Sequence, residues 1–122
     1  MENVNWGILG CGDVCERKSG PPMYKTPHSA LAAVMRRDAA KAADFARRHG
    51  VPKSYTDADA LIADPGVDIV YVATPPDSHR ELALKVLPAG KPVYVEKPMA
   101  MNHAECLDMI AAAERSGQRL FV

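Results

Sequence analysis

The sequence contains few cysteines and few aromatic residues, and it carries no excess of charge of either sign. The 15 Lys and Arg residues balance 15 Asp and Glu residues, so the chain has no basic surplus to neutralise phosphates, and no nucleic-acid partner is expected. No stretch approaches the roughly 18 consecutive apolar residues of a membrane-spanning helix, so no membrane partner is expected either. The first residues form neither the cationic nor the apolar part of a secretory signal, which makes a cytoplasmic location the default expectation.

The cysteines are too few to hold a small fold together. There are only three, Cys11, Cys15 and Cys106, and such an odd, small number does not form a disulfide framework. Cys11 and Cys15 are four residues apart, but a four-ligand zinc site needs a second pair of Cys or His at such a spacing, and the sequence has none. We therefore expect reduced thiols with a packing role and no metal site.

Short apolar runs alternate with helical stretches along a chain whose 122 residues fit a single domain. The strongest run, residues 67–73, is rich in β-branched residues and almost continuously apolar, which is typical of a strand buried on both faces of a parallel sheet. The alternation of strands and helices predicts an α/β fold with a doubly wound parallel sheet. The expected strands are residues 4–9, 30–35, 53–55, 67–73, 92–96 and 119–122.

Capping residues and helix breakers mark the expected helices. Asp38 and Asn102 stand at N-cap positions, and Gly50 and Gly117 stand just after a helix. A stretch rich in proline, residues 19–28, predicts a long loop, and long ordered loops often have functions. The expected helices are residues 13–19, 39–49, 78–87 and 102–116, together with a short one that a capping box at residues 56–59 opens and that runs to residue 63.

A glycine-rich turn follows the first expected strand. Gly10-Cys11-Gly12-Asp13-Val14-Cys15 matches the G-x-G-x-x-G pattern of dinucleotide-binding turns, except that Cys15 replaces the third glycine. The first two glycines of this pattern allow a tight turn and a close approach to a pyrophosphate, which the first amides of the following helix face. The position between a strand and a helix favours dinucleotide binding. The alternative is a tight turn that binds no ligand.

The residues after the second expected strand bear on the choice of cofactor. An NAD-binding domain usually places an acidic residue about 20 residues beyond the glycines, on the ribose 2′-hydroxyl. The sequence has Arg36 and Arg37 there, followed by Asp38. Two guanidinium groups suit a 2′-phosphate and can stack on adenine, so the sequence favours NADP over NAD. The alternative is a solvated arginine pair ahead of a helix that Asp38 caps.

Two further motifs follow the fourth and fifth expected strands, at the sheet edge where ligands of such folds bind. They are Ala73-Thr74-Pro75-Pro76-Asp77-Ser78-His79 and Glu96-Lys97-Pro98. Together with Gly7-Ile8-Leu9-Gly10-Cys11-Gly12, they make the whole chain resemble the N-terminal domain of the Gfo/Idh/MocA oxidoreductases. The resemblance implies a Rossmann domain with strand order 3-2-1-4-5-6 that binds NAD or NADP. It also implies reversible oxidation of a hydroxyl group on a sugar, cyclitol or related compound.

The resemblance further implies a set of cofactor-binding residues and one catalytic residue. All of them stand on the turns that follow the strands. The set comprises Gly10, Gly12, Asp13 and Val14 at the pyrophosphate, Arg36 and Arg37 at the adenosine ribose, Thr74, Pro75, Pro76 and His79 along the cofactor cleft, and Glu96 and Lys97 near the nicotinamide. Lys97 would also touch the substrate oxygen.

The chemistry of hydride transfer supports a role for Lys97 independently. Removing hydride from a carbinol also requires loss of the hydroxyl proton, and an ammonium near the oxygen stabilises the developing charge and can relay that proton. Pro98 favours an extended backbone at Lys97. The alternative is an ordinary surface pair of Glu96 and Lys97 at a strand end. For His79, a role in orienting its turn is favoured over a role as a proton shuttle.

The chain ends where the family normally continues. Family members have a second, larger α+β domain that supplies further catalytic residues and most of the substrate pocket. Residues 1–122 therefore resemble a cofactor-binding half that is truncated within or just after the sixth strand. A polyol or sugar substrate would need the missing domain, so the chain alone is expected to be inactive as a dehydrogenase. Residues 119–122 form a short apolar edge strand, which predicts self-association through this end.

Three other classes of protein compete with the dehydrogenase interpretation. A stand-alone dinucleotide-binding or sensor module would need no catalytic partner. A methyltransferase-like domain also has a glycine turn after its first strand, but it needs an acidic residue at the end of the second strand, where Arg36 stands. A receiver-type signalling domain needs clustered acids near the end of the first strand, where this sequence has glycines.

Overall fold

Six parallel strands form the centre of the protein in a computed structural model that describes residues 3–12 and 15–122. The strands lie in the order β3-β2-β1-β4-β5-β6, which confirms the doubly wound sheet and the Rossmann strand order. The order reverses between β1 and β4, and ligands of such sheets bind outside the carboxyl ends of the strands at this point. The strands are β1 (Val4–Leu9), β2 (Ser29–Met35), β3 (Lys53–Tyr55), β4 (Ile69–Val72), β5 (Val93–Val95) and β6 (Leu120–Phe121).

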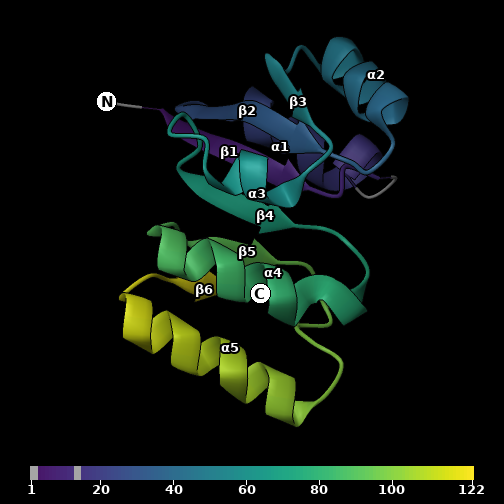
Figure 1. The fold of residues 1–122 in the computed structure, drawn as a ribbon. Helices are drawn as coiled ribbons and strands as arrows, with labels where there is room; N and C mark the ends of the chain where they lie inside the picture. Colours follow the sequence, from purple (N-terminus) through teal and green to yellow (C-terminus); the bar gives the residue numbers. More distant parts are fainter. Residues whose placement is uncertain (1–2, 13–14) are drawn as a thin grey trace.

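In the described part of the chain, five α-helices cover the two faces of the sheet. Figure 1 shows α3, α4 and α5 in front of the sheet, whereas α1 lies behind it. No helix among the described residues is both long and apolar enough to cross a membrane. The helices are α1 (Gly20–Lys25), α2 (Ala39–His49), α3 (Ala58–Ile62), α4 (His79–Val86) and α5 (His103–Ser116).

The alternation of side chains along each strand divides the core into two clusters, one on each face. On β4, Val70 and Val72 belong to the cluster that includes residues of α3, α4 and α5, whereas Tyr71 belongs to the cluster with residues of α2. Leu9 and Ile8 of β1 divide in the same way. All five side chains are buried. Burial on both faces explains why these strands are almost continuously apolar rather than alternately polar.

The ends of the longer helices lie where the caps predict them. Asp38 Oδ1 accepts a hydrogen bond from Lys41 N at 3.1 Å at the start of α2. Gly50 ends the same helix in the left-handed conformation, as Gly117 ends α5. Asn102 caps the start of α5. These local interactions fix where the connecting turns begin, because each satisfies backbone groups that the helix cannot.

The short helix α3 has a different cap from the predicted one. Asp57 is the N-cap, and its side chain accepts a hydrogen bond from Asp59 N at 3.3 Å. The predicted capping box starting at Thr56 is therefore wrong by one residue. The physical reason is that the short carboxylate of Asp57 reaches the amide two residues further on, a local bond that aspartate makes readily.

Residues 19–28 are helical over much of their length, so the predicted long loop is wrong. A π-helical turn, Cys15–Ser19, leads into α1. Pro21 and Pro22 stand in the first turn of α1, where backbone N–H groups have no partner within the helix. The missing N–H groups of proline therefore cost nothing there, and the fixed φ of proline suits a helix start. In this segment the prolines mark a helix start and not a loop.

A buried carboxylate joins β3 to the loop before β4. Asp64 follows α3, and its side chain is 3% exposed. The carboxylate accepts hydrogen bonds from Tyr55 Oη at 2.7 Å, Gly66 N at 2.8 Å and Lys53 Nζ at 3.0 Å. These donors, the Tyr55 hydroxyl foremost, lower the pKa of Asp64 to about 2. The ionised form of Asp64 is therefore the one that stabilises the fold.

Replacing Asp64 by asparagine should make the protein less sensitive to acid. The pKa of Asp64 is about 2 in the folded protein and about 3.9 in an unfolded chain. Ionised Asp64 therefore contributes on the order of 2 kcal/mol to the free energy of unfolding above a pH of about 5. This contribution is lost as the pH falls toward about 2. Urea unfolding at neutral and acid pH should show a smaller loss of stability for Asp64→Asn than for the wild type. An identical pH dependence in the two proteins would contradict this assignment.

Candidate functional site

The glycine turn lies at the carboxyl end of β1, where the ends of β2 and β4 also meet. Gly10 N and Cys11 N both donate to Met35 O of β2, at 2.9 Å and 3.2 Å. Gly10 has a φ of 86°. A Cβ atom at this position would lie 2.8 Å from Thr74 Cγ2 and 3.0 Å from Thr74 N. Glycine is required here twice, once for the backbone conformation and once for the close approach to the turn after β4.

The absence of a side chain at Gly12 has a different explanation. Its amide donates to Gly10 O at 2.8 Å, and a Cβ atom at this position would meet no other atom of the described residues within 4 Å. Packing inside the domain therefore does not require a glycine at Gly12. The missing side chain instead leaves the backbone open to the space outside the turn. Asp13 and Val14, which complete the predicted pyrophosphate set, lie outside the described residues.

Cys15 occupies the third position of the motif and is fully buried against the turn. Its Sγ lies 3.8 Å from Gly10 O, to which it donates a hydrogen bond. Burial raises the pKa of the Cys15 thiol to about 12 and also raises the pKa of the Cys11 thiol. Both thiols are protonated at neutral pH and pack as small apolar groups. The three cysteines, including Cys106, form no disulfide among the described residues.

A cleft of about 810 Å³ opens beside the glycine turn. Residues at the carboxyl ends of β1, β2 and β4 line it, together with residues of α4. It therefore lies at the reversal of strand order, where the fold predicts a ligand. The cleft brings together a large part of the predicted cofactor-binding set, namely Gly10, Gly12, Arg36, Arg37, Thr74 and Pro75.

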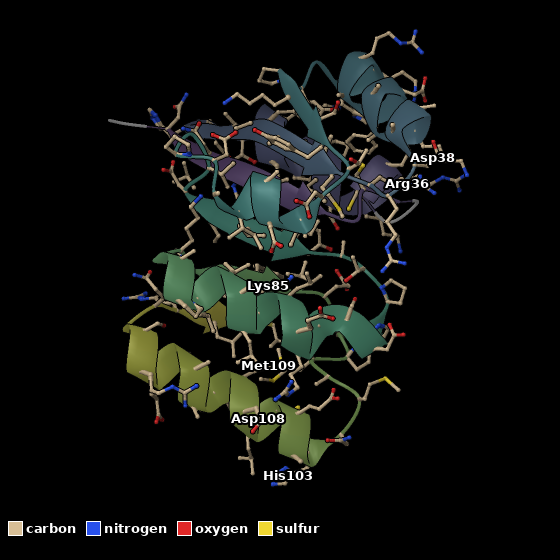
Figure 2. All side chains as sticks on the ribbon, viewed as in Figure 1. Arg36, Asp38, Lys85, His103, Asp108 and Met109 are labelled. Atoms are coloured by element: carbon tan, nitrogen blue, oxygen red, sulfur yellow. The ribbon has the colours of Figure 1, made fainter. Side chains whose placement is uncertain are left out.

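One part of the cleft wall is basic. Arg36 follows β2, and its backbone amide donates to Tyr55 O of β3 at 3.0 Å. Arg37 and Lys41 line the cleft beside it. Figure 2 shows Arg36 and Asp38 at the same end of the sheet, next to the start of α2. One oxygen of Asp38 is bound to the backbone of α2, so this wall offers three cationic side chains and a carboxylate of which one oxygen caps the helix. Lys41 belongs to none of the sequence motifs. The only sequence signal for its place in the cleft wall is its position in the first turn of α2.

The turn after β4 is held by the residues that follow it. Ser78 Oγ donates to Thr74 Oγ1 at 2.6 Å. The buried ring of His79 lies between two carbonyl groups, with Nε2 at 2.6 Å from Thr74 O and Nδ1 at 3.0 Å from Pro98 O. His79 thus links two turns, and in the described part of the chain neither it nor Pro76 lines the cleft.

Glu96 and Lys97 lie one strand further along, at the carboxyl end of β5. Among the described residues, neither lines the cleft at the glycine turn. The carboxylate of Glu96 accepts a hydrogen bond from the Tyr71 hydroxyl of β4. Tyr71 Oη is in turn 3.0 Å from Ser19 Oγ in the π-helical turn. Lys97 is exposed, so its ammonium lies at the surface beside this hydrogen-bonded chain.

The helical segment after the glycine turn is also tied to the end of α2. Glu16 accepts hydrogen bonds from Arg48 and from His49 Nε2, the latter at 2.8 Å. These partners, Arg48 foremost, lower the pKa of Glu16 to about 2. His49 Nδ1 bonds the Tyr24 hydroxyl of α1 at 2.8 Å. No sequence motif indicates this cluster, and its only signal is a group of basic residues in the last turn of α2.

A glycine turn at the reversal of strand order, beside a cleft with a basic wall, defines an NAD(P)-binding Rossmann domain. The family model described as an oxidoreductase family with an NAD-binding Rossmann fold, Gfo/Idh/MocA, matches residues 4–122. The chain belongs to this family, as its motifs predict.

Curated relatives include oxidoreductases with and without a stated substrate. An oxidoreductase of Formosa agariphila is 50% identical over 119 residues, which cover 98% of this chain and 37% of that protein. A trans-1,2-dihydrobenzene-1,2-diol dehydrogenase of Sus scrofa is 36% identical over 116 residues, 93% of this chain and 34% of that protein. The chain thus spans little more than a third of the length of these relatives.

Solved structures show the same fold, and two of the three described here were solved with NADP or NADP+. A 3-ketoreductase from Actinomadura kijaniata, in complex with TDP-benzene and NADP, has a TM-score of 0.92 and 29% identity over 98% of this chain and 37% of that one. A biliverdin reductase from Synechocystis, in complex with biliverdin and NADP+, has a TM-score of 0.88 and 32% identity over the same shares. An aldose-aldose oxidoreductase from Caulobacter crescentus has a TM-score of 0.85 and 36% identity over 96% of this chain and 36% of that one.

Alanine at the two glycines of the turn should have different effects on stability. Gly10→Ala places a Cβ atom against Thr74 in a backbone conformation that alanine rarely adopts, so it should lower the free energy of unfolding by about 1–3 kcal/mol. The methyl group of Gly12→Ala meets no atom of the described residues, so this variant should leave the free energy of unfolding nearly unchanged. Urea unfolding of both variants tests this difference, and equal stability of the two would contradict the proposed geometry of the turn.

Proposed function

We propose that this chain is the dinucleotide-binding half of an oxidoreductase that transfers hydride between NAD(P) and a hydroxyl or carbonyl group of a sugar, cyclitol or related compound. The observation that carries the proposal is the cleft at the reversal of strand order, which is bounded by the bare backbone of Gly12 and by the cations of Arg36 and Arg37. An anionic, elongated ligand with an adenosine end fits this combination of open backbone and basic wall.

The order of the strands supports one direction for the ligand along the sheet edge. The pyrophosphate would lie on the glycine turn, held by Gly10, Gly12, Asp13 and Val14. The adenosine ribose would lie toward β2, against Arg36. The other end of the dinucleotide then runs past β4 toward β5, because β2 and β5 lie on opposite sides of β1 in the sheet. The supporting residues along this path would be Thr74, Pro75, Pro76 and His79, with Glu96 and Lys97 at its end.

The chemistry at the far end of the path would depend on Lys97. When bound, the cofactor supplies the hydride acceptor or donor. The exposed ammonium of Lys97 lies at the end of β5, where it would stabilise negative charge on the substrate oxygen and hold or return its proton. The names of the relatives support a hydroxyl or carbonyl substrate, since they include a dihydrodiol dehydrogenase, a 3-ketoreductase and an aldose-aldose oxidoreductase.

NADP is the preferred cofactor in this proposal. Arg36, Arg37 and Lys41 gather cationic charge where the 2′-position of the adenosine ribose would lie. Asp38, the nearest carboxylate in sequence, uses Oδ1 to cap α2, so only part of its acceptor capacity is left for a 2′-hydroxyl. Two structural neighbours that were solved with NADP support the choice.

Reversing the charge of Arg36 should exchange the cofactor preference. A charge-assisted hydrogen bond to the 2′-phosphate is worth on the order of 1.5–3 kcal/mol, so Arg36→Asp should weaken NADPH binding by roughly tenfold or more and improve NADH binding. Arg80→Asp, on the exposed face of α4 where Arg80 pairs with Asp108, is a control for charge alone. Fluorescence titration with both cofactors measures the ratio. An unchanged ratio in Arg36→Asp would refute the assignment, and so would a wild-type preference for NADH.

The 122-residue chain by itself should bind a dinucleotide and catalyse no turnover. Binding needs only the turn and cleft described above, and Gly12→Ala should weaken it because the new methyl group projects into the open space beside the turn. A substrate pocket would need the larger part of the relatives that this chain does not span. Titration with NADPH and NADH, followed by assays on polyols, tests both statements. Robust turnover by the chain alone would contradict the second statement, and the absence of any binding would contradict the first.

A stand-alone dinucleotide-binding or sensor module is the alternative function. It would have the same cleft but would make no use of an ammonium at the end of β5. Replacing Lys97 by methionine in a protein that carries the full length of the family discriminates the two. Loss of turnover with intact cofactor binding supports catalysis, whereas unchanged behaviour supports the module.

We also infer that the terminal strand associates with a second copy of the chain. β6 forms one edge of the sheet and pairs only with β5 in the described structure. Phe121 is 40% exposed and stacks on Tyr94, itself 39% exposed. An apolar edge strand of this kind offers unpaired backbone groups to another chain.

Sedimentation at several concentrations should therefore show self-association. Phe121→Glu should reduce it, because a charge at the edge opposes strand pairing. Leu107→Glu, on an exposed position of α5, should leave it unchanged. A wild-type chain that stays monomeric at high concentration would contradict the inference, as would association that Phe121→Glu does not weaken.

A further inference from the structure

The turn that carries Lys97 is held from both sides. On one side, the carboxylate of Glu96 accepts a hydrogen bond from the Tyr71 hydroxyl. On the other, Pro98 O lies 3.0 Å from the buried ring of His79. Lys97 stands between these two anchored residues and is itself exposed. The backbone on either side of Lys97 is therefore fixed by side chains of β4 and α4, while its ammonium remains at the surface.

The direction of the hydrogen bonds at Tyr71 follows from the acceptor. An ionised carboxylate can only accept, so the single hydroxyl hydrogen of Tyr71 is donated to Glu96. The Tyr71 oxygen then accepts from Ser19 Oγ, 3.0 Å away. The result is one chain of donors, Ser19 to Tyr71 to Glu96, that leads from the segment after the glycine turn to the end of β5. Burial, and next the Glu96 acceptor, raise the pKa of Tyr71, so this hydrogen stays in place at neutral pH.

The Tyr71 side chain is also well placed to act as a fixed support. It is 2% exposed and packs in the cluster that contains Cys15 of the π-helical turn and Phe45 of α2. A buried tyrosine needs a partner for its hydroxyl, and here the partner is the residue next to Lys97. A ring that is fixed in the core therefore sets the position of a carboxylate at the edge of the sheet.

We propose that Tyr71 is a positioning residue, which holds Glu96 and so sets the direction of the Glu96-Lys97-Pro98 turn at the far end of the dinucleotide path. The proposal rests on the proposed function, because the far end of the path is defined by the dinucleotide. Loss of the Tyr71 hydroxyl leaves the Glu96 carboxylate without its buried donor and free to turn toward the neighbouring Lys97 ammonium. That change would disturb the nicotinamide end of the site and leave the adenosine end, at β2, unaffected.

Two ligands of different length separate positioning from general stability. NADPH reaches both ends of the path, whereas 2′-phospho-ADP-ribose ends at the second ribose and lacks the nicotinamide ring that would lie at the far end. Calorimetric titration of the chain with both ligands should show that Tyr71→Phe weakens NADPH binding by about threefold to tenfold, the worth of one hydrogen bond, and leaves 2′-phospho-ADP-ribose binding unchanged. If the wild type prefers NADH, then NADH and ADP-ribose take their places.

Tyr94→Phe is the matched control, because Tyr94 lies beside Tyr71 on β5 and its hydroxyl makes no hydrogen bond in the described part of the chain. It should change neither affinity. If Tyr71→Phe does not fold, Ser19→Ala removes the first donor of the chain and should give the same split between the ligands at a smaller size. Equal weakening of both ligands, or no weakening of either, would overturn the proposal. Failure of the wild type to bind either ligand would instead overturn the proposed function.

Discussion

Gly10 stands where the ends of three strands converge, and the rest of the site depends on how closely the chain approaches itself there. Its amide binds the last residue of β2, and its missing side chain admits Thr74 from the turn after β4. A side chain at Gly10 would push β1 and β4 apart at the carboxyl edge. The cleft, the turn of Gly12 and the basic wall after β2 are all placed by this contact, since each begins at one of the three strand ends.

Around this contact, polar side chains fix the turns that the backbone alone would leave loose. Glu16 ties the segment after the glycine turn to α2 through Arg48. His79 joins the turn after β4 to the turn after β5, and Tyr71 joins β4 to Glu96. The ties through Tyr71 and His79 satisfy groups that would otherwise be buried without partners, and such unsatisfied groups are costly. The carboxyl edge of the sheet is thus a connected network, whereas the remainder of the core is held mainly by apolar packing.

The strands, most helix ends and much of the cleft could be predicted from the sequence because they depend on local patterns. Asp38 and Gly50 bracket α2, and the apolar runs mark β1 and β4. The helix at Gly20–Lys25 was missed because proline stops a helix in its interior but suits its first turn. The pairing of Tyr71 with Glu96 joins residues 25 positions apart, and no local pattern reports it. The spacing of the motifs likewise does not predict the cis peptide bond between Lys97 and Pro98.

Nuclear magnetic resonance of the labelled chain during titration with NADPH tests the central claim most directly, because it reports where the ligand binds and not only whether it does. The amide signals of Gly10 and Gly12, of Arg36 to Lys41 and of Thr74 should shift most, with smaller shifts at Glu96 and Lys97. Shifts confined to the groove between α4 and α5, where Leu87 and Ala112 lie, would contradict the assignment of the cleft. A spectrum that does not change at millimolar concentrations of NADPH and NADH would contradict it as well.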